Sequence, residues 1–425
     1  MDIKKIYKFN RAIIGLVALG PFIAYFLYVY LSAMDFFKVI QLLCYVGAFL
    51  IILYRSDKNK IVFPPYLLFY LFFIFYEFYS AFIQLDREFK LIYLFSNRLI
   101  GGFLIMFIIE NIRIPGVYFE RILKVSRIIL IIAIAVILVQ QVVNPNFYLR
   151  TDLVDQMHLT TGSEDRLLSI YSWLGLLSIG FSFVPIFLLV VEDSEKRERR
   201  GTMIWILAGL MFALLCKSRW VMVYSSLVFV IYYLNHKKNI LKKLRFFAIL
   251  PVVLLVGYVS LESAGVEIDR IIENRVLEKN KGGLTKGSAS TRLLAFEAFD
   301  RFFWDNPVFG VGNIKYGMGG TGRQDYKLER FLAGKSSQIH VGYLSLFYMY
   351  GVTGGILFIT FLVLLLSKLY KDARYTGRWA PFLGFLGFGL ANFTLVEFSV
   401  LEMGLIITFA ANKYFVQSKQ QMELA

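Results

Sequence analysis

Long apolar runs recur along almost the whole chain, and each of them is about the length that crosses a lipid bilayer. A bilayer core of about 30 Å needs roughly 17–25 apolar residues in a helix. Only 18% of the residues are charged, against about 25% in soluble domains, so a single soluble domain is excluded. The sequence instead predicts about twelve membrane spans, at residues 12–31, 36–54, 61–83, 91–109, 125–143, 167–191, 201–216, 219–234, 245–263, 339–366, 380–397 and 399–416.

The predicted fold is therefore an all-α polytopic membrane protein with one long outer loop. We expect residues 1–263 to form a bundle of about nine spans, 264–338 to form the long loop, and 339–425 to hold the C-terminal spans and an inner tail. The basic start of the chain leads into an apolar stretch without a small-residue cleavage site, so we expect the first helix to be retained.

The distribution of Lys and Arg predicts the orientation in the membrane. The chain has 46 Lys and Arg against 30 Asp and Glu, a net charge of +16. With the N-terminus inside, more than half of these basic residues fall in the predicted inner segments, in accord with the positive-inside rule. Both termini are then cytoplasmic and the long loop is outside, and anionic lipid rather than nucleic acid is the expected partner of the basic surplus.

Cysteine and histidine usage predicts neither a disulfide framework nor a metal centre. Cys44 and Cys216 both lie inside apolar runs. The chain has three histidines, His158, His236 and His340, which leave little room for a His-rich cluster. We therefore expect no metal and no cofactor.

The long loop is where we expect the chemistry, because long loops without a structural role are uncommon. Residues 266–280 and 292–306 have the periodicity of amphipathic helices, which tend to lie in the membrane interface. The apolar face predicted for the second helix consists of Leu293, Phe296, Phe299 and Phe303. The stretch 305–312, Asp-Asn-Pro-Val-Phe-Gly-Val-Gly, has turn chemistry. We interpret it as a structural reversal, because a phosphate-binding loop needs a preceding strand.

A basic tripeptide, Lys217-Ser218-Arg219, stands in the tightest predicted outer turn. Short outer loops of this chain are otherwise poor in Lys and Arg. The tripeptide can be a cation pair that extends from the membrane edge into water. Equally, a guanidinium at this depth is suited to bidentate binding of a phosphate, and the residues alone leave both interpretations open.

Two further candidates lie in and after the long loop. Arg292 follows Ser290 and Thr291, which can cap a helix, and a helix N-terminus with hydroxyls and an Arg can bind an anion. Taken alone, Arg292 is as well explained by an ordinary solvated first turn. His340 stands where the loop re-enters the membrane and can act as a general base near pH 7, or can simply form an interfacial hydrogen bond.

Three carboxylates lie in or near predicted spans, namely Glu77, Glu397 and Glu402. An intramembrane charge indicates either a functional role or an ion pair. Glu397 and Glu402 flank the outer turn of the last two spans, so they can face Arg219 or Arg292. No role follows from the sequence for Glu77 or Glu402.

Together these features resemble the O-antigen ligase and O-antigen polymerase superfamily of bacterial envelope proteins. The resemblance is densest from about 217 to 356 and consists of the basic turn ending in Arg219, the Ser-Thr-Arg-Leu-Leu stretch at Arg292, residues 305–312, His340, and Gly-Val-Thr-Gly-Gly at 351–355. One departure is Val341, because the family usually has Asn, Thr or Ser after the His.

The resemblance implies a membrane-embedded, metal-independent, inverting glycosyltransferase of the bacterial inner membrane. Such an enzyme moves a saccharide from an undecaprenyl diphosphate carrier to an acceptor hydroxyl at the periplasmic face. By matching position, Arg219 and Arg292 would hold the diphosphate and His340 would contact or deprotonate the acceptor. Lys217, Ser218, Ser290 and Glu397 are the expected substrate-binding residues.

Two alternatives to a ligase stay open at this point. A ligase transfers the finished glycan to lipid A-core, whereas a polymerase joins repeat units on the carrier, often with Arg-rich motifs on two outer loops. The earlier outer loop, about 144–166, offers only Arg150 and Arg166, which favours the ligase slightly. A flippase of lipid-linked saccharides would instead place paired, interrupted helices and charges near the midplane.

Overall fold

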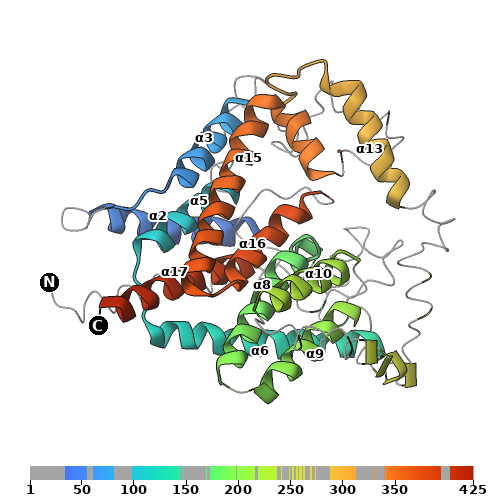
Figure 1. The fold of residues 1–425 in the computed structure, drawn as a ribbon. Helices are drawn as coiled ribbons and strands as arrows, with labels where there is room; N and C mark the ends of the chain where they lie inside the picture. The colour runs from blue at the N-terminus through green and yellow to red at the C-terminus, as the bar shows by residue number, and fades with distance from the viewer. Residues whose placement is uncertain are drawn as a thin grey trace.

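The computed structural model describes residues 34–54, 61–80, 98–143, 173–197, 199–215, 219–236, 288–312, 341–393 and 403–424, with isolated positions such as 147, 169, 331 and 339 and a few between 241 and 273. Every regular element in these ranges is a helix. In chain order the helices are α2 (Met34–Tyr54), α3 (Pro65–Tyr79), α5 (Arg98–Asn111), α6 (Gly116–Val142), α8 (Trp173–Arg197), α9 (Arg199–Leu215), α10 (Arg219–His236), α13 (Ser288–Phe303), α15 (Gly342–Thr376), α16 (Ala380–Ala391) and α17 (Met403–Leu424) (Figure 1).

These helices coincide with the apolar runs, so the all-α fold class is confirmed for the described ranges. On either side of the basic turn, α9 is described to Leu215 and α10 from Arg219, while residues 216–218 lie outside the described residues. The first predicted span, 12–31, about half of the ninth, 245–263, and most of the first amphipathic helix, 266–280, lie outside the described residues. The count of twelve spans and the three-part division of the chain therefore stay predictions.

The helices have the composition and surface of a membrane bundle. Within the described ranges, α6 and α15 are long and apolar enough to cross a membrane, and several shorter helices, including α3 and α16, are also apolar. Large apolar side chains stand on the outside of the bundle, such as Phe75 on α3 at 60% exposure and Ile131 on α6 at 56%. Such a surface is unfavourable in water and suits lipid.

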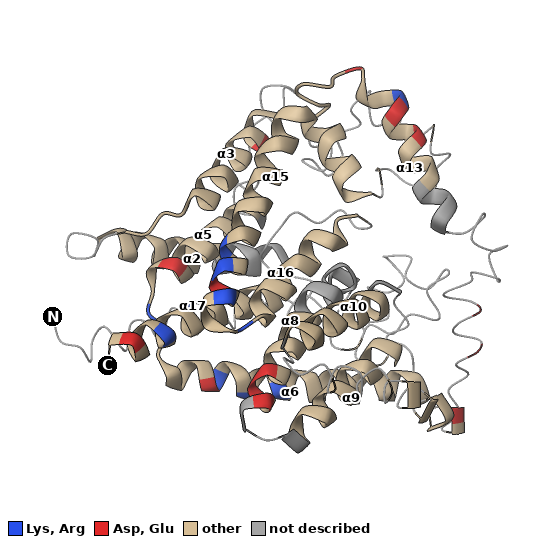
Figure 2. Ribbon diagram, viewed as in Figure 1, with Lys and Arg blue, Asp and Glu red and all other residues tan. Residues whose placement is uncertain are grey.

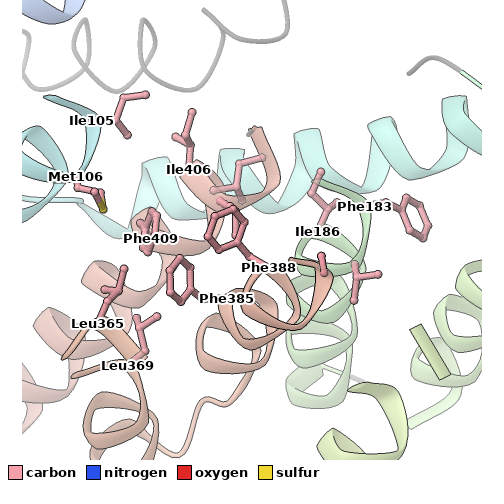
Figure 3. Packing of buried hydrophobic residues seen from close by; sticks show 14 of the residues in the cluster. Ile105, Met106, Phe183, Ile186, Leu365, Leu369, Phe385, Phe388, Ile406 and Phe409 are labelled. Carbon is pink, nitrogen blue, oxygen red and sulfur yellow. The ribbon is translucent and has the colours of Figure 1, made fainter. Parts of the chain in front are cut away.

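The core is built where the C-terminal helices pack against earlier ones. In Figure 1, α3 and α15 run side by side, and α16 and α17 lie against α8. Figure 3 shows Phe385 and Phe388 of α16 beside Ile406 and Phe409 of α17. The rings of Phe385 and Phe409 are 5.7 Å apart, at a tilt that favours aromatic pairing. The C-terminal segment is therefore part of one bundle with the earlier spans.

Charged groups gather at one end of this bundle. Figure 2 shows them on α6, on α17 and on the adjoining part of α15, whereas the upper lengths of α3 and α15 are mostly tan. Lys368 of α15 lies 3.1 Å from Glu110 of α5, and Lys413 of α17 lies 3.6 Å from the same carboxylate. Arg127 of α6 pairs with Asp193 of α8. These ion pairs join five helices at the end predicted to be cytoplasmic.

The start of α16 is held by a buried carboxylate from another helix. Oε1 of Glu192 on α8 accepts hydrogen bonds from the backbone nitrogens of Trp379 at 2.7 Å and Ala380 at 3.2 Å. The first N–H groups of a helix have no partner within the helix. Glu192 supplies an acceptor for these N–H groups and so fixes the start of α16 relative to α8.

One side chain links Phe147 and Ser169, which flank a segment predicted to be an outer loop. Nε2 of Gln140, near the end of α6, donates to the carbonyl of Phe147 at 2.9 Å, and its Oε1 accepts from the backbone nitrogen of Ser169 at 2.8 Å. Gln140 is fully buried. The loop between residues 147 and 169 is thus closed at its base by this amide.

Candidate functional site

The helix that follows His340 is broken near its start. Within α15, Gly351 has φ 62° and ψ −169°, a backbone conformation outside the helical region. L-residues with a side chain rarely adopt this positive φ, whereas glycine does so at little cost. The break divides α15 into a half-helix, Gly342–Tyr350, and a longer part that runs to Thr376. The predicted span 339–366 is therefore interrupted, which the apolar pattern did not predict.

The loop 305–312 fills this break with its own backbone. A break leaves helical N–H and C=O groups without partners, which is costly away from water. Four backbone hydrogen bonds from the loop satisfy them: Val311 N to Tyr348 O (3.1 Å), Gly312 N to Met349 O (2.8 Å), Val352 N to Pro307 O (2.8 Å) and Thr353 N to Val308 O (3.1 Å). We call the loop 305–312 together with residues 348–353 the break junction.

Two glycines make the junction possible. A Cβ atom on Gly310 would lie under 3.0 Å from the backbone nitrogen of Gly351, and one on Gly351 would lie equally close to the carbonyl of Val308. Gly310 and Gly312 have φ 72° and 89°, which confirms the tight reversal predicted from the sequence. The role of the motif is structural, because its backbone completes a helix.

The first turn of the half-helix is fixed to α16. The cap position is Val341, whose side chain forms no capping hydrogen bond. The backbone nitrogen of Tyr343 instead donates to the carbonyl of Asn392 at 3.1 Å. The side-chain hydroxyl of Tyr343 donates to the carbonyl of Gly389 at 2.6 Å. The α16 backbone thus supplies the acceptor that a polar residue after the His would offer as a cap.

The other end of the half-helix is fixed to α3. The hydroxyl of Tyr350 donates to Oε1 of Glu77 at 3.0 Å, in a buried contact. The hydroxyl of the neighbouring Tyr76 donates to the carbonyl of Phe309, in the loop, at 2.8 Å. Two consecutive residues of α3 therefore bind the two parts of the break junction: Tyr76 binds the loop and Glu77 binds the half-helix.

The helix that carries Arg292 packs on α15, and the apolar face predicted for it divides into two parts. Phe303 is buried and Phe299 packs against the core, whereas Leu293 and Phe296 are 63% and 54% exposed. Ala295 and Ala298 are also buried, and such small residues let two helices approach closely. The helix also begins earlier than the predicted 292–306, at Ser288.

The helix that begins with Arg219 is seated by a tyrosine. Tyr224 of α10 is buried, and its hydroxyl lies 3.2 Å from the carbonyl of Leu383 and 3.1 Å from that of Gly384, both on α16. Its ring occupies the place where a side chain on Gly387 would stand. Thus α16 holds both α10 and the start of the half-helix.

The main candidate residues share a position relative to helix starts. Arg219 is the first residue of α10, Arg292 is the fifth of α13, and His340 stands two positions before the first residue of α15. None of these helices has an acidic residue in its first turn. Helix N-termini carry partial positive charge and free N–H groups, which favour anions.

The side chains of several predicted site residues lie outside the described part of the structure. For Arg219, Arg292 and Ser290 the backbone is described as helical, while the side chains are not. The remaining predicted residues, Lys217, Ser218, His340 and Glu397, fall entirely outside the described ranges. Convergence of Arg219, Arg292 and His340 therefore stays a prediction.

Comparison with known families agrees with the resemblance seen in the sequence. Residues 202–359 match the family model described as O-antigen ligase. The match includes α10, α13, the break junction and the first part of α15. No curated protein matches the chain.

Proposed function

We propose that this chain, whose residues 202–359 match the O-antigen ligase family, transfers saccharide from an undecaprenyl-diphosphate carrier to an acceptor hydroxyl. The reaction takes place at the periplasmic face of the bacterial inner membrane. The observation that carries the proposal is that the matched segment holds the starts of α10, α13 and α15, with Arg219 and Arg292 in the first turns of α10 and α13 and His340 two positions before α15 in the sequence. The break junction and α16 hold these helices in one unit.

In this reaction the acceptor oxygen attacks the anomeric carbon on the face opposite the diphosphate. The carbon–oxygen bond to the diphosphate breaks, the leaving group takes the electron pair, and the configuration inverts. His340 accepts the proton of the acceptor hydroxyl, a step worth roughly 10²–10⁴-fold in rate.

Arg219 and Arg292 bind the departing diphosphate together with the N–H groups of their helix starts. Fixed positive charge in a partly dehydrated site stabilises such charge more than water does. Lys217, Ser218 and Ser290 add donors beside these two residues, and Glu397 orients a sugar hydroxyl or an Arg. The guanidinium groups supply the charge that a metal would provide in other transferases.

Within this superfamily we favour the ligase, with lipid A-core as the acceptor, because the basic candidates concentrate in one region after residue 216. One observation favours the polymerase. Gln140 binds residues 147 and 169 at the two ends of the earlier loop. Within that loop, Arg150 comes three positions after residue 147 and Arg166 three positions before residue 169. A polymerase would use this second loop for its other carrier-linked substrate.

A reconstituted transfer assay separates these activities. Purified protein in proteoliposomes receives a lipid-diphosphate-linked repeat unit, with and without lipid A-core. Product only with lipid A-core supports the ligase, and product that lengthens without it supports the polymerase. If wild type and the Arg292→Ala variant are equally without product in both arms, the transferase proposal is refuted in favour of the flippase.

A further inference from the structure

Glu77 is a carboxylate that an apolar membrane helix would not contain without a reason. It is the one charged residue of α3, Pro65–Tyr79, and only 4% of its surface is exposed. A buried carboxylate costs several kcal/mol unless it is hydrogen-bonded. Charges inside membrane segments therefore mark either pairing or function.

One contact of Glu77 is with the residue next to the helix break. Tyr350, whose hydroxyl lies 3.0 Å from Oε1 of Glu77, directly precedes Gly351. Its ring packs edge-on against Phe73, one turn earlier on α3, at 5.2 Å. Rotation of the Tyr350 side chain is thus restricted by both its ring and its hydroxyl.

Gly354, four residues after Tyr350, brings α15 and α3 into close contact. A Cβ atom on Gly354 would lie 2.8 Å from the ring of Tyr76, so α15 passes α3 with no room for a side chain. Tyr76 also binds the carbonyl of Phe309. The outer turn of α3 therefore fits closely against the break junction, and Glu77 is its polar contact with the half-helix.

We propose that Glu77 is a positioning residue, which through Tyr350 fixes the end of the half-helix Gly342–Tyr350 and so the segment that begins at His340. The inference rests on the proposed transferase function. The half-helix has a side-chain anchor at each end, Tyr343 on α16 and Tyr350 on α3, and backbone hydrogen bonds from the loop also hold the end near Tyr350. Without the Tyr350 anchor only those backbone bonds fix this end, so the direction of the half-helix, and of the segment that precedes it, is less closely set.

A positioning role and a purely structural role predict opposite results for an apolar replacement. Replacing both partners of a buried hydrogen bond by apolar groups of the same shape can be nearly neutral or stabilising. Glu77→Leu, combined with Tyr350→Phe so that no hydroxyl is left without its acceptor, is therefore expected to fold at least as well as wild type. If Glu77 positions the half-helix, this double variant still loses activity, because misplacement of about 1 Å costs on the order of 100-fold in rate.

The test uses the full chain in nanodiscs and measures transfer and amide exchange on the same preparations. We expect Glu77→Leu, Tyr350→Phe and the double variant to lower kcat by roughly 10- to 100-fold, without a matching rise in donor KM. Glu77→Gln should restore most of kcat, since its amide oxygen still accepts the bond from Tyr350. Tyr232→Phe is the matched control, because it removes a Tyr–Glu contact between α10 and α8.

Amide exchange provides a measure that does not depend on turnover. In the Leu and Phe variants, the amides of Val352 and Thr353 should exchange faster than in wild type, whereas in Glu77→Gln and Tyr232→Phe they should not. Unchanged exchange and unchanged kcat in the double variant would overturn the inference, and so would a kcat loss that Glu77→Gln shares in full. A wild type without transfer would refute the proposed function, and exchange alone would then decide whether Glu77 positions the half-helix.

Discussion

Gly310 and Gly351 lie so close together that neither position can carry a side chain. A Cβ atom on either residue would lie under 3.0 Å from backbone atoms of the other's segment, and both have positive φ angles, 72° and 62°. The two glycines are 41 positions apart in the chain. Their contact joins the end of the outer loop to the helix that follows His340, so it links the two halves of the candidate site.

Replacing Gly351 with Ala should disrupt this junction. The new methyl group would meet the carbonyl of Val308, which accepts the junction hydrogen bond from the backbone nitrogen of Thr353 and so cannot move without weakening it. We expect a loss of several kcal/mol in stability, as for other strained and overpacked sites. The loss should appear as a lower midpoint of thermal unfolding in detergent and as lost transfer.

Gly377 provides the matched control for that substitution. It has the same φ as Gly310, 72°, but no heavy atom lies within 4 Å of the place that a Cβ on Gly377 would take. Gly377→Ala should therefore cost only the backbone strain, on the order of 1 kcal/mol. Equal losses in Gly351→Ala and Gly377→Ala would show that the close approach in the junction is not what matters.

Gly387 should be intolerant of Ala for a different reason. Its Cβ would overlap the ring of Tyr224, which seats α10 against α16. Ejecting that ring should lower stability by roughly 1–3 kcal/mol and reduce transfer, because α10 begins with Arg219. Gly389→Ala, in the same helix, meets only Tyr343 Oη at 3.8 Å and should behave as wild type. Similar unfolding midpoints for the two variants would contradict this packing.

Removal of the carboxylate that caps α16 should weaken the same support. Glu192→Ala leaves the backbone nitrogens of Trp379 and Ala380 without their acceptor, at a cost of about 1–2 kcal/mol. Glu192→Gln retains an acceptor oxygen and should recover part of that loss. Midpoints of thermal unfolding should fall in the order wild type, Glu192→Gln, Glu192→Ala. A Gln variant less stable than the Ala variant would refute the capping role.

Several features of the fold follow from local sequence. The apolar runs predict the helices because a bilayer sets their length, and α9 is described to Leu215 and α10 from Arg219, on either side of the predicted turn. The reversal at residues 305–312 was predictable because Pro and Gly restrict the backbone locally. The family resemblance was visible because its motif residues keep their order along the chain.

Other features depend on contacts between distant residues. Gly351 stands in an apolar run compatible with one continuous helix, and its break is stabilised by a loop some 40 positions earlier. Of the apolar face predicted for α13, Phe303 is buried, whereas Leu293 and Phe296 are exposed. The buried Ala295 and Ala298 could not be recognised as contact residues from the apolar pattern, because alanine is common on every face of a helix. Glu77 drew attention as a charge in a span, but its partner Tyr350 is 273 positions away.

Chelation should leave transfer unchanged. In the proposed mechanism Arg219 and Arg292 supply the positive charge at the diphosphate, so no divalent cation takes part. Transfer rates of the wild type in proteoliposomes with and without excess EDTA should agree within about twofold, since the guanidinium groups stay charged at any working pH. A large loss that magnesium restores would contradict the metal-independent mechanism.

If the carrier's diphosphate binds at the starts of α10 and α13, equilibrium binding of undecaprenyl diphosphate depends on the Arg residues at these two positions. Arg292→Ala and Arg219→Ala should each weaken binding by at least about tenfold, the value of a lost charge-assisted hydrogen bond. Arg301→Ala is the matched control, because Arg301 lies at the other end of α13, stacked over Phe302 and Phe331. Undecaprenol, which lacks the diphosphate, should bind all four proteins alike. If Arg292→Ala and Arg219→Ala bind the diphosphate as tightly as wild type and Arg301→Ala do, the account is contradicted.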